Sequence, residues 1–185
     1  IDMCDECFLN YKKEDFDKEE KSILVSIGGS DPLNISKSIL SVLKKKNYYK
    51  VTYATLDQEE ANKLDKEFGQ EINIISGKDI DELLLKANFA ITNAGNTGTE
   101  AITSGCKTLS LVLADNQIKN SRLIQKLGGT IIDFKDISKT TLLEEKINSL
   151  LESKGGKEIS FVDFGIRLMR EIDLIIYKKF KKGRL

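Results

Sequence analysis

Three short polar segments of this 185-residue chain combine residue types that bind anions and hydroxyl groups. They are Gly28-Gly29-Ser30-Asp31-Pro32, Asn93-Ala94-Gly95-Asn96-Thr97-Gly98-Thr99-Glu100 and Leu113-Ala114-Asp115-Asn116-Gln117. Glycines let a bulky anion approach the backbone, and hydroxyl and amide groups hydrogen-bond a phosphate without adding charge. The three segments together predict a site for a ligand that carries phosphate and many hydroxyl groups.

The first segment has two interpretations. Gly28, Gly29 and Ser30 can bind a phosphate together with the free N–H groups of a following helix. Alternatively, the segment is a plain strand-to-helix turn in which Asp31 or Asn34 caps the helix. Its spacing matches neither the dinucleotide fingerprint G-x-G-x-x-G nor the ATPase phosphate loop G-x-x-x-x-G-K-[ST]. The first segment alone leaves both interpretations open.

The second segment places Gly95, Asn96 and Thr97 at an expected helix start, where they would face phosphate. Glu100 follows within about one turn, and its carboxylate can accept two hydrogen bonds from a ribose diol. The alternative is a capping box in which Glu100 partners Thr97. Because two glycine-rich loops are expected to face each other, we favour contact with a nucleotide.

The third segment supplies side-chain donors and acceptors directly after an expected strand. Asp115, Asn116 and Gln117 are the kind of residues that recognise sugar hydroxyls. The alternative is that Asp115 or Asn116 caps a helix while Gln117 is simply exposed.

Alternating apolar runs and amphipathic windows indicate how these segments are positioned. We expect strands at 23–27, 51–54, 72–75, 89–92, 108–113 and 130–133, and helices at 34–46, 58–68, 79–86, 97–104, 116–127, about 139–152 and 159–181. This alternation predicts an α/β fold: a doubly wound, Rossmann-like parallel sheet of six strands in the order 3-2-1-4-5-6. Ligands of such sheets bind where the order reverses, which selects the loops after Ile27 and Thr92.

Composition excludes several classes of partner. Lys+Arg and Asp+Glu both count 29, so no field of one sign favours nucleic acid or a membrane surface. The basic run at 178–184 is interpreted as the solvated last turn of a helix. No apolar stretch approaches the roughly 20 residues of a membrane span. The chain begins at Ile1 without an initiator Met or a signal peptide, so we expect a piece of a longer cytoplasmic protein.

Cysteine and histidine usage bounds the chemistry. Cys4 and Cys7 form a Cys-x-x-Cys, but zinc needs two further ligands and the chain has no histidine. We therefore favour incidental thiols over metal or redox function, and interpret Cys106 as a small core side chain. We expect no metal and no cofactor. Any general acid or base within the chain must be Asp, Glu, Lys, Tyr or Cys.

Taken in order, the three segments resemble the C-terminal domain of the nucleotide-sugar hydrolases of pseudaminic acid biosynthesis and their relatives in spore-coat polysaccharide synthesis. That family is similar to the peptidoglycan UDP-GlcNAc transferase and shares its two-domain glycosyltransferase B-type fold. The segment Asp163-Phe164-Gly165 is similar to the family's Asp-Gly-x-Gly ending, with Phe164 in place of the first glycine. The resemblance runs from about residue 22 to residue 172.

The resemblance implies a role for each matching position. Glu100 would bind the ribose hydroxyls, Ile80 would offer backbone groups to uracil, and Asn116 and Gln117 would face the sugar. The diphosphate would be lined by Gly29, Ser30, Gly95, Asn96 and Thr97. The family's proposed base is a histidine of the N-terminal domain, so we assign no catalytic residue here.

The function implied is the nucleotide-binding half of a UDP-sugar hydrolase that releases UDP from a deoxy amino sugar in surface polysaccharide or flagellar glycan biosynthesis. Residues 1–21 would be a linker from an N-terminal domain of the same protein, and 22–185 the nucleotide-sugar-binding domain. The isolated chain is then expected to be inactive. Two alternatives stay open: the donor-binding domain of a UDP-sugar glycosyltransferase, and a non-catalytic domain that kept the fold.

Overall fold

A six-stranded, fully parallel sheet forms the centre of the computed structural model. The structure describes residues 21–153 except 29–30, 32–33, 47–48, 78–79 and 138–139. The strands are β1 Ser22–Ser26, β2 Lys50–Thr55, β3 Asn73–Ser76, β4 Phe89–Asn93, β5 Lys107–Val112 and β6 Thr130–Asp133. Their order in the sheet, β3-β2-β1-β4-β5-β6, confirms the order predicted from the sequence. Nearly all of the expected linker and the expected helix at 159–181 lie outside the described residues.

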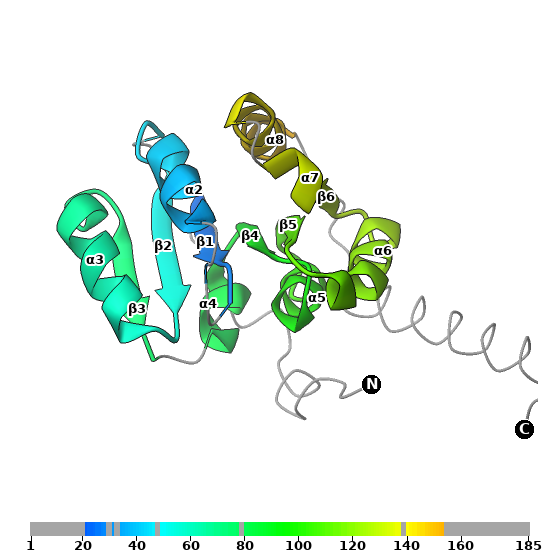
Figure 1. The fold of residues 1–185 in the computed structure, drawn as a ribbon, viewed down its shortest axis with the longest axis horizontal. Coiled ribbons are helices and arrows are strands. Elements are labelled where there is room, and N and C mark those ends of the chain that lie inside the picture. The colour runs from blue at the N-terminus through cyan, green and yellow to red at the C-terminus, as the bar shows by residue number, and fades with distance from the viewer. Residues whose placement is uncertain are drawn as a thin grey trace, which may run out of the picture.

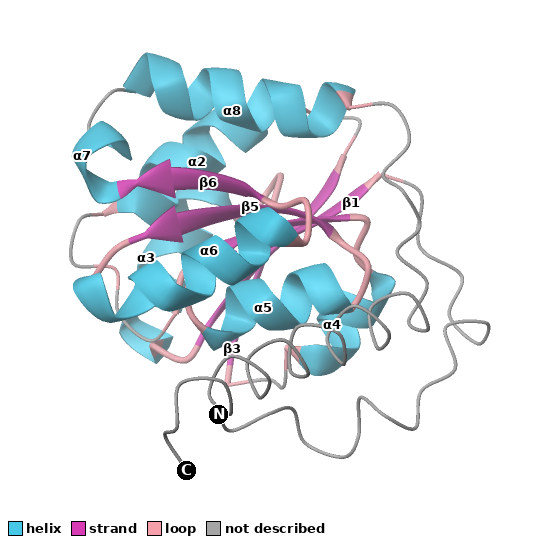
Figure 2. Ribbon diagram, turned by 90° about the vertical axis from the view of Figure 1, so that its right-hand side faces the viewer, coloured by secondary structure: helices cyan, strands magenta, loops and turns pink. Residues whose placement is uncertain are grey.

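Both faces of the sheet are covered by helices (Figures 1 and 2). The helices on one face are α2 Ile35–Leu43, α3 Gln58–Phe68 and α8 Thr140–Glu152; those on the other are α4 Asp81–Lys86, α5 Asn96–Thr103 and α6 Ile118–Lys126. A short helix, α7 Phe134–Ile137, links β6 to α8. No helix of the described part is both long and apolar enough to cross a membrane.

Strand β1 shows why the sheet is buried on both sides. All five of its residues are buried, and successive side chains of a strand point to opposite faces. Ile23 and Val25 belong to the large core beneath α2, α3 and α8, whereas Leu24 belongs to the smaller core beneath α4 and α5. A continuous apolar run is typical of a central parallel strand covered on both faces.

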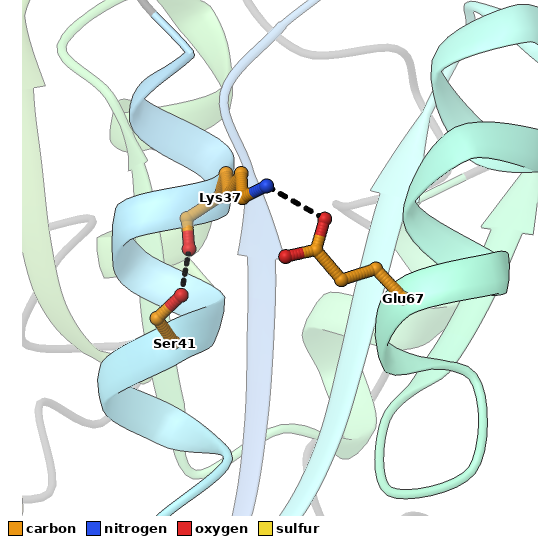
Figure 3. A network of polar contacts seen from close by, with 3 residues as sticks. All are labelled: Lys37, Ser41 and Glu67. Carbon is orange, nitrogen blue, oxygen red and sulfur yellow. Dashed lines mark hydrogen bonds and ion pairs between the residues drawn. The ribbon is translucent and has the colours of Figure 1, made fainter.

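One ion pair between α2 and α3 and one hydrogen bond within α2 lie at the exposed surface of the first face. Lys37 of α2 pairs with Glu67 of α3 at 2.8 Å, and the Ser41 hydroxyl donates to the Lys37 carbonyl at 2.8 Å (Figure 3). Both charged side chains are about half exposed. Such a surface pair contributes only about 0–1 kcal/mol, so apolar burial and not this bridge holds α2 and α3 on the sheet.

Two segments depart from the expected helices. The helix expected at 116–127 is a 3-10 turn, η2 Asp115–Gln117, followed by α6. The helix expected at about 139–152 is confirmed as α8, but α7 precedes it and was not predicted. Gly128 has φ +97 and directly follows Leu127, the cap residue of α6, as is common at helix ends.

Candidate functional site

The order of the strands reverses between β1 and β4, and the two loops at this point are joined by one side chain. The Asn93 amide nitrogen donates to the Ile27 carbonyl at 3.0 Å, and its amide oxygen accepts from the Gly95 N–H at 3.1 Å. Gly28, the next residue of the first loop, has φ +104. The structure therefore brings the two predicted loops together at the carboxyl edge of the sheet.

The N-terminus of α5 lies at the same edge. Gly95 is the cap residue and makes no side-chain cap hydrogen bond, and the first turn carries no acidic residue. Asn96 is exposed and Thr97 half-buried. The first N–H groups of a helix have no partner within the helix and carry a partial positive charge. This end of α5 therefore offers backbone donors to an anion.

Glu100 is the fifth residue of α5 and is half-buried. The capping-box alternative requires Thr97 to precede the helix. Thr97 is instead the second helical residue, because the helix begins at Asn96 after the cap residue Gly95. That alternative is therefore wrong.

The N-terminus of α2 differs from that of α5. The Asp31 carboxylate accepts from the Ile35 N–H at 2.9 Å and from the Ser36 N–H at 2.7 Å. The expectation that this helix start presents free N–H groups is wrong at these two residues, and the alternative of a cap by Asp31 is confirmed. Gly29 and Ser30 lie outside the described residues.

The third predicted segment forms the turn η2 after β5. Asp115 and Asn116 are exposed and Gln117 is half-buried. Neither η2 nor α6 shows a side-chain cap, so the capping alternative for Asp115 and Asn116 is wrong. The Gln117 side chain is not simply exposed either, because its amide oxygen accepts from the Leu113 N–H at 2.7 Å. This bond uses the amide oxygen of Gln117 and not its amide nitrogen.

Ile80 is the cap residue of α4, two strands away from β1 along the same edge of the sheet. Its side chain packs against the core cluster that contains Leu24 and Leu84. The side chain of Ile80 is partly buried, and its carbonyl accepts from the Leu84 N–H at 2.9 Å.

A buried polar network beside the α2 start was missed by sequence reasoning. The Tyr53 hydroxyl bonds to the Ser36 hydroxyl at 2.8 Å and donates to the Glu60 carboxylate at 2.8 Å. The other Glu60 oxygen accepts from the Thr55 hydroxyl at 2.7 Å. Burial, and next the Glu60 carboxylate, raise the pKa of Tyr53 well above its ordinary value of 10. The signal available was an aromatic residue with a hydroxyl at an inward position of a strand.

Asn93 opens the second predicted segment, but no role was predicted for its side chain. It ends β4 and looks in the sequence like one more polar residue before a glycine-rich turn. Asparagine is typical of turns because its amide hydrogen-bonds the backbone two residues further on, which is its bond to Gly95. Its second bond, to Ile27, joins residues 66 positions apart and leaves no local pattern.

No protein-family model matches the chain, and no curated protein matches it closely. Among solved structures, the spinosyn rhamnosyltransferase SpnG, complexed with spinosyn aglycone, aligns over 83% of this chain and 42% of its own with TM-score 0.64 and 16% identity. LpCGTa in complex with UDP aligns over 72% of this chain and 33% of its own, with TM-score 0.55 and 17% identity. The chain thus spans less than half the length of these two proteins.

A similar fold also occurs in an enzyme that is not a glycosyltransferase. A phenylacrylic acid decarboxylase from Aquifex aeolicus aligns over 74% of this chain and 99% of its own, with TM-score 0.50 and 12% identity. At such identities each likeness concerns the fold alone. The fold is a Rossmann-like α/β sheet that matches half of a glycosyltransferase B-type fold.

Proposed function

We propose that this chain is the donor-binding half of a glycosyltransferase that uses a nucleotide-linked sugar, with UDP as the nucleotide. The observation that carries the proposal is the uncapped N-terminus of α5 at the reversal point of the sheet, beside Gly28. Ligands of doubly wound sheets bind at this point, and helix starts bind phosphate. The fold that this chain shares with SpnG and LpCGTa supports the proposal.

Each predicted residue takes a role along the carboxyl edge of the sheet. Backbone groups of Gly95, Asn96 and Thr97 bind the diphosphate, and the Glu100 carboxylate binds the ribose hydroxyls. The occupied start of α2 supports placing the diphosphate at α5, because the Asp31 carboxylate already fills the N–H groups of Ile35 and Ser36. The roles of Gly29 and Ser30 at the diphosphate stay predictions.

The remaining predicted residues divide between the base and the sugar. Backbone groups of Ile80 contact uracil, while its partly buried side chain packs against the core. Asp115 and Asn116, both exposed, hydrogen-bond the sugar together with the Gln117 amide nitrogen.

Hydrolysis of a UDP-sugar is the second candidate function. Its support is the resemblance of the polar segments, including Asp115-Asn116-Gln117, to the nucleotide-sugar hydrolases. The two functions share the donor site and differ in what attacks the anomeric carbon of the sugar: water in the hydrolase, an acceptor hydroxyl in the transferase. A partner domain of the same protein would supply that distinction.

Calorimetric titration tests the proposed site. We expect UDP to bind and Glu100→Ala to weaken its binding by about tenfold to a hundredfold, because hydrogen bonds to a charged group contribute about 1.5–3 kcal/mol. Glu67→Ala is the matched control, because Glu67 lies on the other face of the sheet in α3 and should leave UDP affinity unchanged. No heat with UDP, CDP or TDP would instead favour a non-catalytic domain that kept the fold.

A further inference from the structure

We propose that Asn93 is a positioning residue that holds the nucleotide site in its binding geometry before ligand arrives. The inference rests on the proposed function, since it assumes that UDP binds at the start of α5. The Asn93 side chain hydrogen-bonds both loops: its amide nitrogen donates to the first, and its amide oxygen accepts from the second.

The two hydrogen bonds fix the orientation of the Asn93 amide. Its nitrogen faces a carbonyl, that of Ile27, and its oxygen faces an N–H, that of Gly95. A flipped amide would set oxygen against oxygen and N–H against N–H, so only one orientation satisfies both partners. The side chain thereby sets the distance between the end of β1 and the cap residue of α5.

Gly28 and Gly95 leave room for the Asn93 side chain because neither residue has a Cβ. A Cβ at Gly28 would lie 2.6 Å from the Asn93 amide nitrogen, and a Cβ at Gly95 would lie 3.0 Å from its amide oxygen. Two of the predicted phosphate-binding glycines, Gly28 and Gly95, therefore also make room for the Asn93 side chain. Gly28, Gly95 and this amide therefore lie against one another at the reversal point.

A positioned site binds more tightly because the ligand does not have to order the loops itself. The Asn93–Gly95 bond holds the cap residue of α5 in place. The position of the cap residue in turn sets the direction of the N–H groups in the first turn. The Asn93–Ile27 bond holds the neighbouring Gly28 backbone beside them. Without Asn93, we expect the chain to fold and the phosphate contacts to lose their mutual alignment.

The chain offers a matched control at the opposite edge of the same two strands. Asn88, just before β4, accepts through its amide oxygen from the Ser22 N–H and the Ser22 hydroxyl, both at 3.1 Å. Asn88 therefore ties the beginnings of β1 and β4, as Asn93 ties their ends. Removing either side chain costs hydrogen bonds beside β1 and β4, but only Asn93 lies beside the proposed site.

The test compares UDP affinity of the unsubstituted chain, Asn93→Ala and Asn88→Ala, with urea denaturation of each. We expect both variants to lose stability, Asn93→Ala to bind UDP at least about tenfold more weakly, and Asn88→Ala to stay within about twofold. Uridine, which carries no phosphate, should lose much less affinity than UDP in Asn93→Ala. If the role of Asn93 were purely structural, Asn93→Ala would lower stability without changing the ratio of UDP affinity to uridine affinity.

A second variant covers the case in which Asn93→Ala does not fold. In Asn93→Ser the hydroxyl can still accept from the Gly95 N–H, as serine does in turns, but is too short to reach Ile27 as well. We expect its UDP affinity to fall between those of the unsubstituted chain and Asn93→Ala, or, without the latter, clearly below that of Asn88→Ala. UDP binding by the unsubstituted chain with equal affinity in Asn93→Ser or Asn93→Ala would overturn the inference alone. Absence of UDP binding by the unsubstituted chain would overturn the proposed function and the inference with it.

Discussion

Gly28 and Gly128 both have a positive φ but lie in very different surroundings. Their φ angles are +104 and +97, a region that side chains with a Cβ enter at a cost of about 1–2 kcal/mol. Among the described residues, no atom beyond the chain neighbours lies within 4 Å of the place that a Cβ would take at Gly128, whereas at Gly28 the Asn93 amide nitrogen lies 2.6 Å away. The two glycines therefore separate backbone strain from displacement of Asn93.

We predict that Gly28→Ala destabilises the chain more than Gly128→Ala does. Both should lose about 1–2 kcal/mol to the positive φ, and Gly28→Ala at least about 1 kcal/mol more, because Asn93 must give up a hydrogen bond. The free energies of unfolding in urea would show the difference. Equal losses in the two variants would mean that Asn93 moves aside without cost.

Tyr53 is the one described residue whose raised pKa gives a clear pH dependence. Below pH 10 the phenol is protonated in both the folded and the unfolded chain. Above pH 10 the unfolded chain ionises while the folded chain, in which Tyr53 is fully buried, keeps its proton. The free energy of unfolding then falls by about 1.4 kcal/mol per pH unit from this group.

We predict that Tyr53→Phe flattens this alkaline loss of stability. At neutral pH the variant should itself be less stable by about 1–2 kcal/mol, because the bonds to Ser36 and Glu60 are lost. Urea denaturation at several values between pH 8 and pH 11 would compare the two slopes. The same slope in the variant would assign the alkaline loss to other groups.

At the residue scale, the sequence predicted which polar residues lie in which loops, but not which hydrogen bonds they make within the chain. Asp31 was recognised both as part of a polar loop and as a cap, and only the structure shows its carboxylate on Ile35 and Ser36. Gln117 was expected to face a ligand, and half of its amide is bound to Leu113. Local sequence supplies donors and acceptors without saying which of them the chain itself uses.

At the scale of elements, prediction succeeded where a helix carries its own boundaries. Helix α3 begins and ends at the predicted residues, because Asp57 accepts from the Glu59 and Glu60 N–H groups and Gly69 follows the last turn. The order of the strands was predicted from the alternation of strands and helices, right-handed crossovers and the order common in Rossmann-like sheets. Helix α7 was missed because a helix of four residues shows no period.

Helix α5 depends on a glycine that was not singled out as a site residue. Gly98 is buried, and a Cβ there would lie 2.6 Å from the Asn93 carbonyl oxygen and 2.8 Å from both the Ile124 side chain and the Ser110 hydroxyl. The glycine therefore lets α5 approach β4, β5 and α6 closely. The position of the proposed phosphate site follows from this close approach.

We predict that Gly98→Ala destabilises the chain by about 1–3 kcal/mol, as overpacking does. Alanine in a helix interior normally gains up to about 1 kcal/mol over glycine, so the sign of the change is informative. Asn96→Ala, at an exposed position of the same helix, should change stability by no more than about 0.5 kcal/mol. A Gly98→Ala chain as stable as the unsubstituted one would contradict the close approach of α5.

At the scale of the whole molecule, the polar segments share one edge of one sheet. Residues after β1, β3, β4 and β5 carry the proposed contacts to phosphate, base and sugar. Parallel strands place all their carboxyl ends on the same edge, so an order of strands deduced from the sequence already gathers these loops. The proposed contacts all serve a nucleotide-sugar donor, and the chain spans less than half the length of SpnG and LpCGTa.

We predict that the chain alone binds UDP but releases none from UDP-sugars. The proposed contacts are backbone N–H groups, amides and carboxylates that position a leaving diphosphate, and the 185 residues contain no histidine to activate water or an acceptor. A coupled assay for UDP, run with UDP-GlcNAc and related UDP-sugars at saturating concentration, would measure release against a blank without protein. Release above the blank that disappears in Glu100→Ala would show that the chain holds a complete active site, and would overturn its assignment as half of one.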